Sequence, residues 1–199
     1  LELHCESGEA LFSHIAGLKM VVPSNPYDTK GLLAAAIRDP DPVIFYEPMR
    51  IYRAIKQDIP EDDYIVPLGK ANVIQPGSDV TLIAWGAMIK TCQDSIAKLQ
   101  GKYSVELIDL RTINPYDAET IVNSVKKTGR CVIAHEAQRT AGFAAELAAS
   151  INEKALLSLH APVARVTGPD VPIPMAKLEG YYLPDANRII KGIEKVMSF

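Results

Sequence analysis

The stretch VTLIAWGAMIKTCQDSIAKL, residues 80–99, decides the fold class of this 199-residue chain. Its first five residues are apolar or β-branched and predict a short buried strand. From residue 87 onward the apolar residues recur at helical spacing, which predicts a helix that runs to residue 99. A buried strand followed directly by a helix is the repeating unit of α/β folds.

The same unit recurs along the C-terminal half of the chain. The last helix is the best marked, because Asp185 can cap its first turn and apolar residues follow at helical spacing. Strands that alternate with helices favour a three-layer αβα fold, in which helices cover both faces of a mostly parallel sheet. Further strands are predicted at residues 105–110, 131–134 and 163–166, and further helices at residues 117–127, 142–157 and 186–197.

A shorter pattern of the same kind precedes this region. Helices are expected at residues 8–16 and 25–37, and strands at residues 18–22 and 43–46. Between residues 48 and 77 the pattern gives way to charged and turn-forming residues, which is typical of a linker between two domains.

The composition excludes several classes of protein. With 48% hydrophobic residues, 23% charged residues and a net charge of -3, the chain has the composition of a soluble globular protein. Acidic and basic residues are interspersed, so we expect no nucleic-acid partner. No apolar run reaches the roughly 18 to 20 residues that span a bilayer, so we expect no membrane insertion.

The cysteines and the first residue indicate where the chain comes from. Cys5, Cys92 and Cys131 are too widely spaced for a disulfide framework or a metal-binding Cys-x-x-Cys pair, which favours a reducing, intracellular compartment. The chain begins with Leu1 instead of methionine. We therefore expect that an upstream portion exists.

The common dinucleotide, P-loop, zinc-protease and serine-hydrolase motifs are missing from the sequence, but two histidines lie where a site is expected. His4 precedes the first predicted helix, from where it could relay a proton at a site completed by other segments. His135 ends a predicted strand, at the rim where doubly wound sheets collect functional groups. Each has a structural alternative, His4 as a surface residue and His135 as a hydrogen-bonding partner of a loop backbone.

The turn that ends the second predicted helix is a candidate cation site. Free main-chain carbonyls are expected there beside the carboxylates of Asp39 and Asp41. Oxygen ligands suit a hard cation. The alternative, which the spacing alone favours, is a helix stop shaped by Pro40 and Pro42.

Several segments, taken in order, resemble one family. They are LKMVVPSNPYDTKGLL at residues 18–33, AIRD at 36–39, YIVPLGKA at 64–71, VELIDLRTINP at 105–115 and the run from APV at 161 to GPD at 170. These segments resemble the β subunits of pyruvate and branched-chain 2-oxo acid dehydrogenases. The resemblance covers essentially the whole chain.

The resemblance implies a domain organisation and an activity. Residues 1–50 would be the end of a pyrimidine-binding domain, residues 51–70 a linker, and residues 71–199 a transketolase-type C-terminal domain. The complete enzyme would use thiamine diphosphate and Mg²⁺, whose main ligands lie outside this chain, to decarboxylate pyruvate or a branched-chain 2-oxo acid and pass the acyl group to a lipoyl group. The family's catalytic glutamate lies upstream of Leu1, so the isolated chain is expected to be inactive.

The resemblance also implies site residues and partners. His4 matches the family's active-site histidine, and Ala36, Ile37, Asp39 and Asp41 match positions that hold a structural potassium ion, although an asparagine often stands in place of Asp41. The implied partners are the E1 α subunit, in an α2β2 heterotetramer, and the subunit-binding and lipoyl domains of the E2 dihydrolipoyl acyltransferase. The implied location is the cytoplasm of a bacterium or the mitochondrial matrix.

Two alternatives to the enzyme subunit stay open. The chain could be a non-catalytic assembly and E2-docking module, for which Asp170, Glu179, Asp185 and the end of the chain at Phe199 are candidate anchors. It could also be the C-terminal part of a transketolase-like enzyme. A diphosphate-binding motif upstream in the same chain would favour that reading, and a separate α subunit would favour the dehydrogenase.

Overall fold

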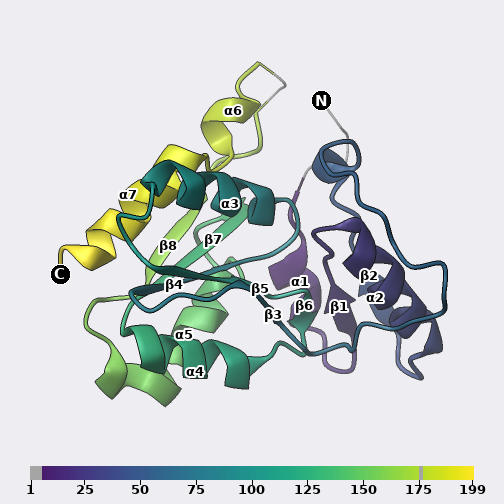
Figure 1. Cartoon of the computed structure of the whole chain (residues 1–199). Coiled ribbons are helices and arrows are strands. Elements are labelled where there is room, and N and C mark those ends of the chain that lie inside the picture. Colours follow the sequence, from purple (N-terminus) through teal and green to yellow (C-terminus); the bar gives the residue numbers. More distant parts are fainter. Residues whose placement is uncertain (1–5, 175–176) are drawn as a thin grey trace.

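The computed structural model describes residues 6–174 and 177–199. Figure 1 shows two parts side by side, which we call the N-terminal part (residues 6–70) and the larger part (residues 71–199). The N-terminal part contains most of a three-stranded sheet, sheet A, and the larger part contains a five-stranded sheet, sheet B.

Sheet B has the strand order β3-β5-β4-β7-β8. β5, β4, β7 and β8 run parallel to one another, whereas β3 is antiparallel to β5 at one edge. Every residue of β4 and β5 is buried, because helices cover both faces of the sheet. The strands are β3 (Asn72–Gln75), β4 (Val80–Ala84), β5 (Val105–Asp109), β7 (Cys131–Gln138) and β8 (Ala164–Gly168).

Two long helices pack on each face of sheet B (Figure 1). Leu82 of β4 belongs to a core shared with α3 and α7, and the next residue, Ile83, belongs to a core shared with α4 and α5, as alternation along a strand requires. The predicted three-layer αβα fold is therefore confirmed. The helices are α3 (Met88–Leu99), α4 (Ala118–Thr128), α5 (Ala144–Ala155) and α7 (Ala186–Met197), with the short helices η2 (Leu156–Ser158) and α6 (Glu179–Tyr182).

Sheet A is centred on β1, which pairs in parallel with β2 and antiparallel with β6. Leu32 of α2 packs on one side of it with Val21. From the other side, Met20 and Val22 join the core of the larger part, so the two parts share apolar contacts. The elements are α1 (Glu9–Ser13), β1 (Lys19–Val21), α2 (Pro26–Arg38), β2 (Val43–Phe45), η1 (Met49–Ile51) and β6 (Thr112–Asn114).

The strand β6 belongs to the larger part in sequence but completes the sheet of the N-terminal part. The chain leaves β5 at Asp109 and turns at Arg111, whose φ of 58° lies in the left-handed region. The main-chain oxygen of Arg111 then accepts a hydrogen bond from the amide of Val22 at 2.8 Å. β6 therefore links the two parts. No pattern in the sequence had indicated this link.

Polar side chains cap α2, α4 and α7 at their predicted starts. Asn25 at α2 and Asp185 at α7 each accept a hydrogen bond from a main-chain amide of the first turn, at 2.9 and 2.8 Å. Asp117 does the same for α4 at 3.1 Å. These bonds satisfy amides that a helix start otherwise leaves without a partner.

Most predicted elements agree with the structure. The strand at residues 80–84 and the helix at residues 186–197 agree at both ends, whereas α1 is shorter than the predicted helix 8–16. Neither β3 nor β6 was predicted: β3 lies within residues 48–77, which were assigned to a linker, and β6 is a three-residue strand that follows the turn after β5. Within the described ranges, no helix is both long and apolar enough to cross a membrane.

The caps lead to a prediction about stability. Asp185→Ala should lower the free energy of unfolding by about 1 kcal/mol, because one cap is lost. Asp117→Ala should lower it by more, because the buried Asp117 carboxylate also accepts from the Ala71 amide at 3.2 Å and the Thr120 hydroxyl at 2.9 Å. Denaturant unfolding of both variants measures the difference, and equal losses would contradict the extra bonds.

Candidate functional site

The topology of sheet B indicates where a site should lie. After β4 the chain passes through α3 to β5 on one side, and after β7 it passes through α5 to β8 on the other side. Ligands of doubly wound sheets bind in the crevice at the carboxyl ends of the strands where the direction changes. Here that place is marked by Trp85, which follows β4, and by His135 and Glu136 of β7.

Side chains of the N-terminal part fill this crevice. The indole N–H of Trp85 donates a hydrogen bond to Oε1 of Glu9 in α1 at 2.9 Å. Burial raises the pKa of Glu9, the Trp85 bond opposes this rise, and nearby Glu136 adds to it. The other carboxyl oxygen, Oε2, has no hydrogen-bond partner among the residues described. Glu9 therefore favours the protonated form more than an exposed glutamate does.

His135 packs as an aromatic ring in the same place. It stacks on Trp85 with the ring centres 5.3 Å apart, and it is 1% exposed. Burial lowers its pKa to about 4, so the ring is neutral at physiological pH. Neither ring nitrogen has a hydrogen-bond partner in the described part of the chain, so the hydrogen-bonding role predicted for it is not observed. The structure gives His135 a packing role.

Glu136 makes the second polar link between the two parts. Its carboxylate pairs with the guanidinium of Arg50 in η1, with 2.7 Å between oxygen and nitrogen. Burial raises the pKa of Glu136, Arg50 opposes the rise and Glu179 adds to it. We call Glu9, Arg50, Trp85, His135 and Glu136 the junction cluster. Its contacts hold α1 and η1 against sheet B, where other doubly wound folds bind a ligand.

A second buried cluster lies at the end of β5. Arg111 binds both carboxylate oxygens of Asp28, through Nε at 2.9 Å and Nη2 at 2.6 Å, and the Asp28 side chain is 1% exposed. Behind this pair, Asp109 accepts a short hydrogen bond from the Ser24 hydroxyl and another from the Arg111 amide at 3.1 Å. Burial raises the pKa of Asp109 to about 7, although the Ser24 bond lowers it. This carboxyl group therefore titrates near neutral pH.

The predicted site residues have different outcomes. His4 lies outside the described residues. Asp39 and Asp41 lie together at the end of α2, where the ammonium of Lys19 binds Asp39 at 2.8 and 2.9 Å and Asp41 at 3.0 Å. The hydrogen bond from Lys19 lowers the pKa of Asp39. The two carboxylates already share an internal cation, and the Ala36 main-chain oxygen accepts the Asp39 amide at 3.4 Å.

No three His, Cys, Asp or Glu side chains in the described part of the chain gather closely enough to hold a metal ion. A potassium site would use main-chain oxygens as well as carboxylates, so it need not contain three such side chains. This finding therefore leaves the potassium prediction untested.

Two domain families match the chain, one after the other along the sequence. Residues 2–54 match "Transketolase, pyrimidine binding domain" and residues 69–189 match "Transketolase, C-terminal domain". The chain belongs to the family of the transketolase C-terminal domain. The strand order of sheet B and its helix-covered faces are thus the architecture of a transketolase C-terminal domain.

Named relatives match almost the whole chain. The pyruvate dehydrogenase E1 component subunit beta of Acholeplasma laidlawii is 50% identical over 98% of this chain and 60% of its own length. The mitochondrial 2-oxoisovalerate dehydrogenase subunit beta of Dictyostelium discoideum is 48% identical over 98% of this chain and 53% of its own. The Bacillus subtilis pyruvate dehydrogenase subunit is 45% identical, over 61% of its length. The resemblance is confirmed, and the chain spans between half and two thirds of these relatives.

Solved structures of the family share the fold. A split gene transketolase, described as an inactive beta4 tetramer, matches with a TM-score of 0.79 over 95% of this chain and 60% of that chain, at 24% identity. The transketolase from Leishmania mexicana matches with a TM-score of 0.62 over 95% of this chain and 26% of that chain, at 16% identity. At these identities the likeness shows the fold alone.

Sequence reasoning missed the two clusters that join the parts of this transketolase-family chain. The segment that contains Asp109 and Arg111 was noticed for its resemblance and not for its chemistry. A charged residue directly after a buried strand was the available signal, because such a charge needs a partner. Glu9 carried a weaker signal, since a glutamate in the first turn of a helix is commonly solvent-exposed.

The raised pKa of Asp109 makes stability depend on pH. Folded Asp109 keeps its proton up to a pH of about 7, whereas the unfolded group loses it near its ordinary pKa of 3.8. The folded state therefore binds more protons between these values, and the contribution of Asp109 to the free energy of unfolding falls as the pH rises through this window. Asp109→Asn should remove this dependence.

Denaturant unfolding of the wild type and Asp109→Asn at several pH values tests this prediction. Relative to the variant, the wild type should lose stability with rising pH at up to about 1.4 kcal/mol per pH unit, the limit for one proton. Asp94→Asn, at a side chain that is 51% exposed, is the control and should follow the wild type. Parallel profiles for wild type and Asp109→Asn would show that Asp109 is ionised throughout.

Proposed function

We propose that the chain is the C-terminal part of the β subunit of a thiamine-diphosphate-dependent 2-oxo acid dehydrogenase. One observation carries the proposal: relatives named as pyruvate and 2-oxoisovalerate dehydrogenase β subunits are 45–50% identical to it along almost its whole length. The similarity to these relatives extends over both matched domains, residues 2–54 and residues 69–189. The complete enzyme would decarboxylate pyruvate or a branched-chain 2-oxo acid and transfer the acyl group to the lipoyl group of E2.

The binding site for the cofactor would be completed by groups beyond the described residues. Thiamine diphosphate would supply the carbanion-stabilising chemistry of the decarboxylation when it is bound. Its diphosphate and Mg²⁺ need a set of oxygen ligands, and among the residues described no cluster of carboxylates forms one. We therefore assign these ligands to the α subunit and derive no step through the cofactor from this chain.

The described residues would act as the frame of the active site. The junction cluster fixes α1 to sheet B through the Trp85–Glu9 bond of 2.9 Å and the Arg50–Glu136 pair of 2.7 Å. α1 begins five residues after His4, the proposed catalytic histidine. A fixed α1 would limit the positions open to that histidine, and effective molarities of about 10⁵ to 10⁸ M depend on such orientation.

The same geometry also supports the alternative of a non-catalytic assembly and docking module, because the junction side chains are engaged in holding the two parts together. The proposed partners are the E1 α subunit and E2. Among the candidate anchors for E2, Asp170 already accepts bonds from Thr140 and Asp185 caps α7, whereas Phe199 is 73% exposed. The relatives are bacterial and mitochondrial proteins, so we propose the bacterial cytoplasm or the mitochondrial matrix as the location.

A mutation of His4 tests the proposed activity in the full-length β subunit assembled with its α subunit. His4→Ala should lower 2-oxo acid decarboxylation or reductive acylation by about two to four orders of magnitude, the range for a lost acid-base group. His14→Ala, at an exposed position in the cap of α1, is the matched control and should keep the wild-type rate. A wild-type assembly that decarboxylates neither pyruvate nor a branched-chain 2-oxo acid would favour the docking module.

The proposed potassium site is tested by exchanging the cation. Replacing K⁺ with tetraethylammonium should lower the melting temperature, because K⁺ that binds the folded state stabilises it by mass action. Lys19→Met should enlarge this effect, since Asp39 and Asp41 then lose the ammonium that lies 2.8 to 3.0 Å from them. Melting temperatures that are the same in both salts, for both proteins, would support a plain helix stop.

A further inference from the structure

A cleft of about 680 Å³ opens between the two parts of the chain, on the side of β3 and α3. We call it the seam cleft. Its volume lies within the roughly 300 to 1,000 Å³ of small-molecule sites. Residues from both parts line it, among them Asn25, Lys56 and Gln57 from the N-terminal part and Ile74, Lys90 and Arg111 from the larger part.

The lining of the seam cleft carries excess positive charge. Lys56, Lys90 and Arg111 contribute three cations, against one carboxylate, Asp28, among the described lining residues. Asp28 is fully engaged, because Arg111 binds both of its oxygens. The charge of Lys56 has no carboxylate partner among the described lining residues, and the charge of Lys90 is met only by an exposed surface pair with Asp94. An anion in the cleft would balance this excess of positive charge.

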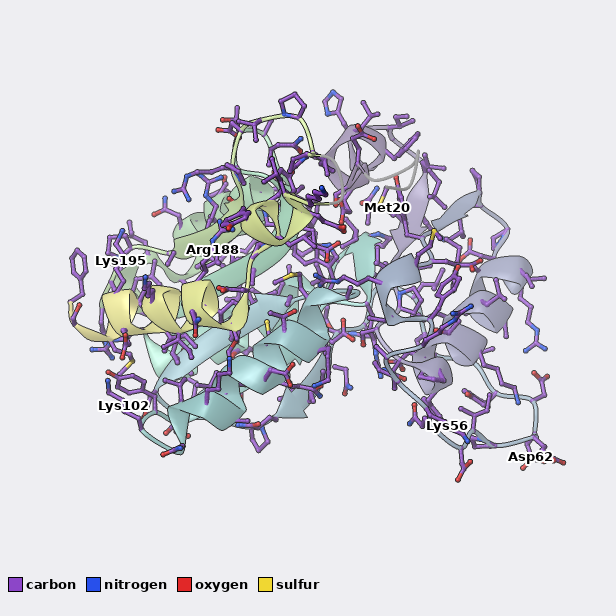
Figure 2. All side chains as sticks on the ribbon, turned by 90° about the horizontal axis from the view of Figure 1, so that it is seen from above. Met20, Lys56, Asp62, Lys102, Arg188 and Lys195 are labelled. Carbon is purple, nitrogen blue, oxygen red and sulfur yellow. The ribbon has the colours of Figure 1, made fainter. Side chains whose placement is uncertain are left out.

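The cations are available to a ligand. Lys90 pairs with Asp94 one helical turn away, but these side chains are 46% and 51% exposed, and such surface pairs contribute little. Arg111 uses Nε and Nη2 for Asp28, and its Nη1 has no hydrogen-bond partner among the residues described. Figure 2 shows Lys56 on the loop of the N-terminal part, well away from Lys102 and Lys195.

Two helix starts add to the positive potential. Tyr27, in the first turn of α2, lines the cleft, and its amide donates only a long bond of 3.3 Å to the Gln57 side chain. Ile89 and Lys90, in the first turn of α3, line the opposite side. The amino ends of helices carry partial positive charge and favour anions, above all phosphate.

The remaining lining suits an organic body attached to the anion. Ile55, Ile74 and Ile89 offer apolar surface, and Asn72 and Gln93 offer amide donors and acceptors. We propose that the seam cleft binds a small organic phosphate of the size of a nucleoside monophosphate. Its phosphate lies between Lys56, Lys90 and the Arg111 Nη1 group, and its organic body lies on the isoleucines. Such a ligand contacts both parts and stabilises the seam between them.

Calorimetric titration of the complete protein with AMP and, separately, with inorganic phosphate tests the proposal. AMP should bind saturably, more tightly than phosphate of the same charge, and should raise the melting temperature. The double variant Lys56→Ala/Lys90→Ala should weaken AMP binding at least about tenfold, because two charge-assisted contacts are lost. The double variant Lys102→Ala/Lys195→Ala is the matched control: both lysines are exposed and lie on the larger part, away from Lys56, so binding should be unchanged.

Three outcomes would overturn the proposal. Saturable binding of neither compound would show that the cleft holds no phosphate. Equal affinities for AMP and phosphate would remove the organic body from the site. Equal weakening by Lys56→Ala/Lys90→Ala and by Lys102→Ala/Lys195→Ala would show general attraction of anions to the surface instead of a site. Both variants replace exposed lysines, so loss of the fold does not obscure the result.

Discussion

The ion pair between Asp28 of α2 and Arg111 after β5 is the contact on which the arrangement of the two parts depends. The Asp28 side chain is 1% exposed, and a buried carboxylate without its counter-charge destabilises a fold by several kcal/mol. α2 therefore cannot move away from the end of β5. The next residue after Arg111, Thr112, begins β6, so the pair also directs the chain into sheet A.

One residue, Arg111, donates hydrogen bonds to two buried carboxyl groups at this point. Arg111 gives its side chain to Asp28, whereas Asp109 receives the Arg111 main-chain amide and the Ser24 hydroxyl. Burial of Asp109 and, to a lesser extent, the charge of nearby Asp28 disfavour a negative charge on Asp109, which explains the pKa of about 7. The contact between the two parts is thereby coupled to pH near neutrality.

The two faces of the seam between the parts have different chemistry. On one, the junction cluster fills the switch point of sheet B with an aromatic stack and two carboxyl groups of raised pKa. On the other, the seam cleft stays open and carries the charge of Lys56, unpaired among the described residues, and the surface-paired charge of Lys90. The chain's own side chains therefore occupy the switch point, whereas the seam cleft on the other face stays open.

Local patterns account for what could be predicted. The sequence by itself determined the alternating strands and helices, the cap at Asp185 and the family, because periodicity, capping and motifs are properties of neighbouring residues. It also predicted that the carboxylates of Asp39 and Asp41 lie together at the end of a helix. Only the tertiary structure decided that Lys19 lies between them, that β6 joins sheet A, and which charges pair across the seam. Glu9 and Trp85 are 76 positions apart and Asp28 and Arg111 are 83 apart, and contacts over such separations depend on how whole elements pack, which no local pattern records.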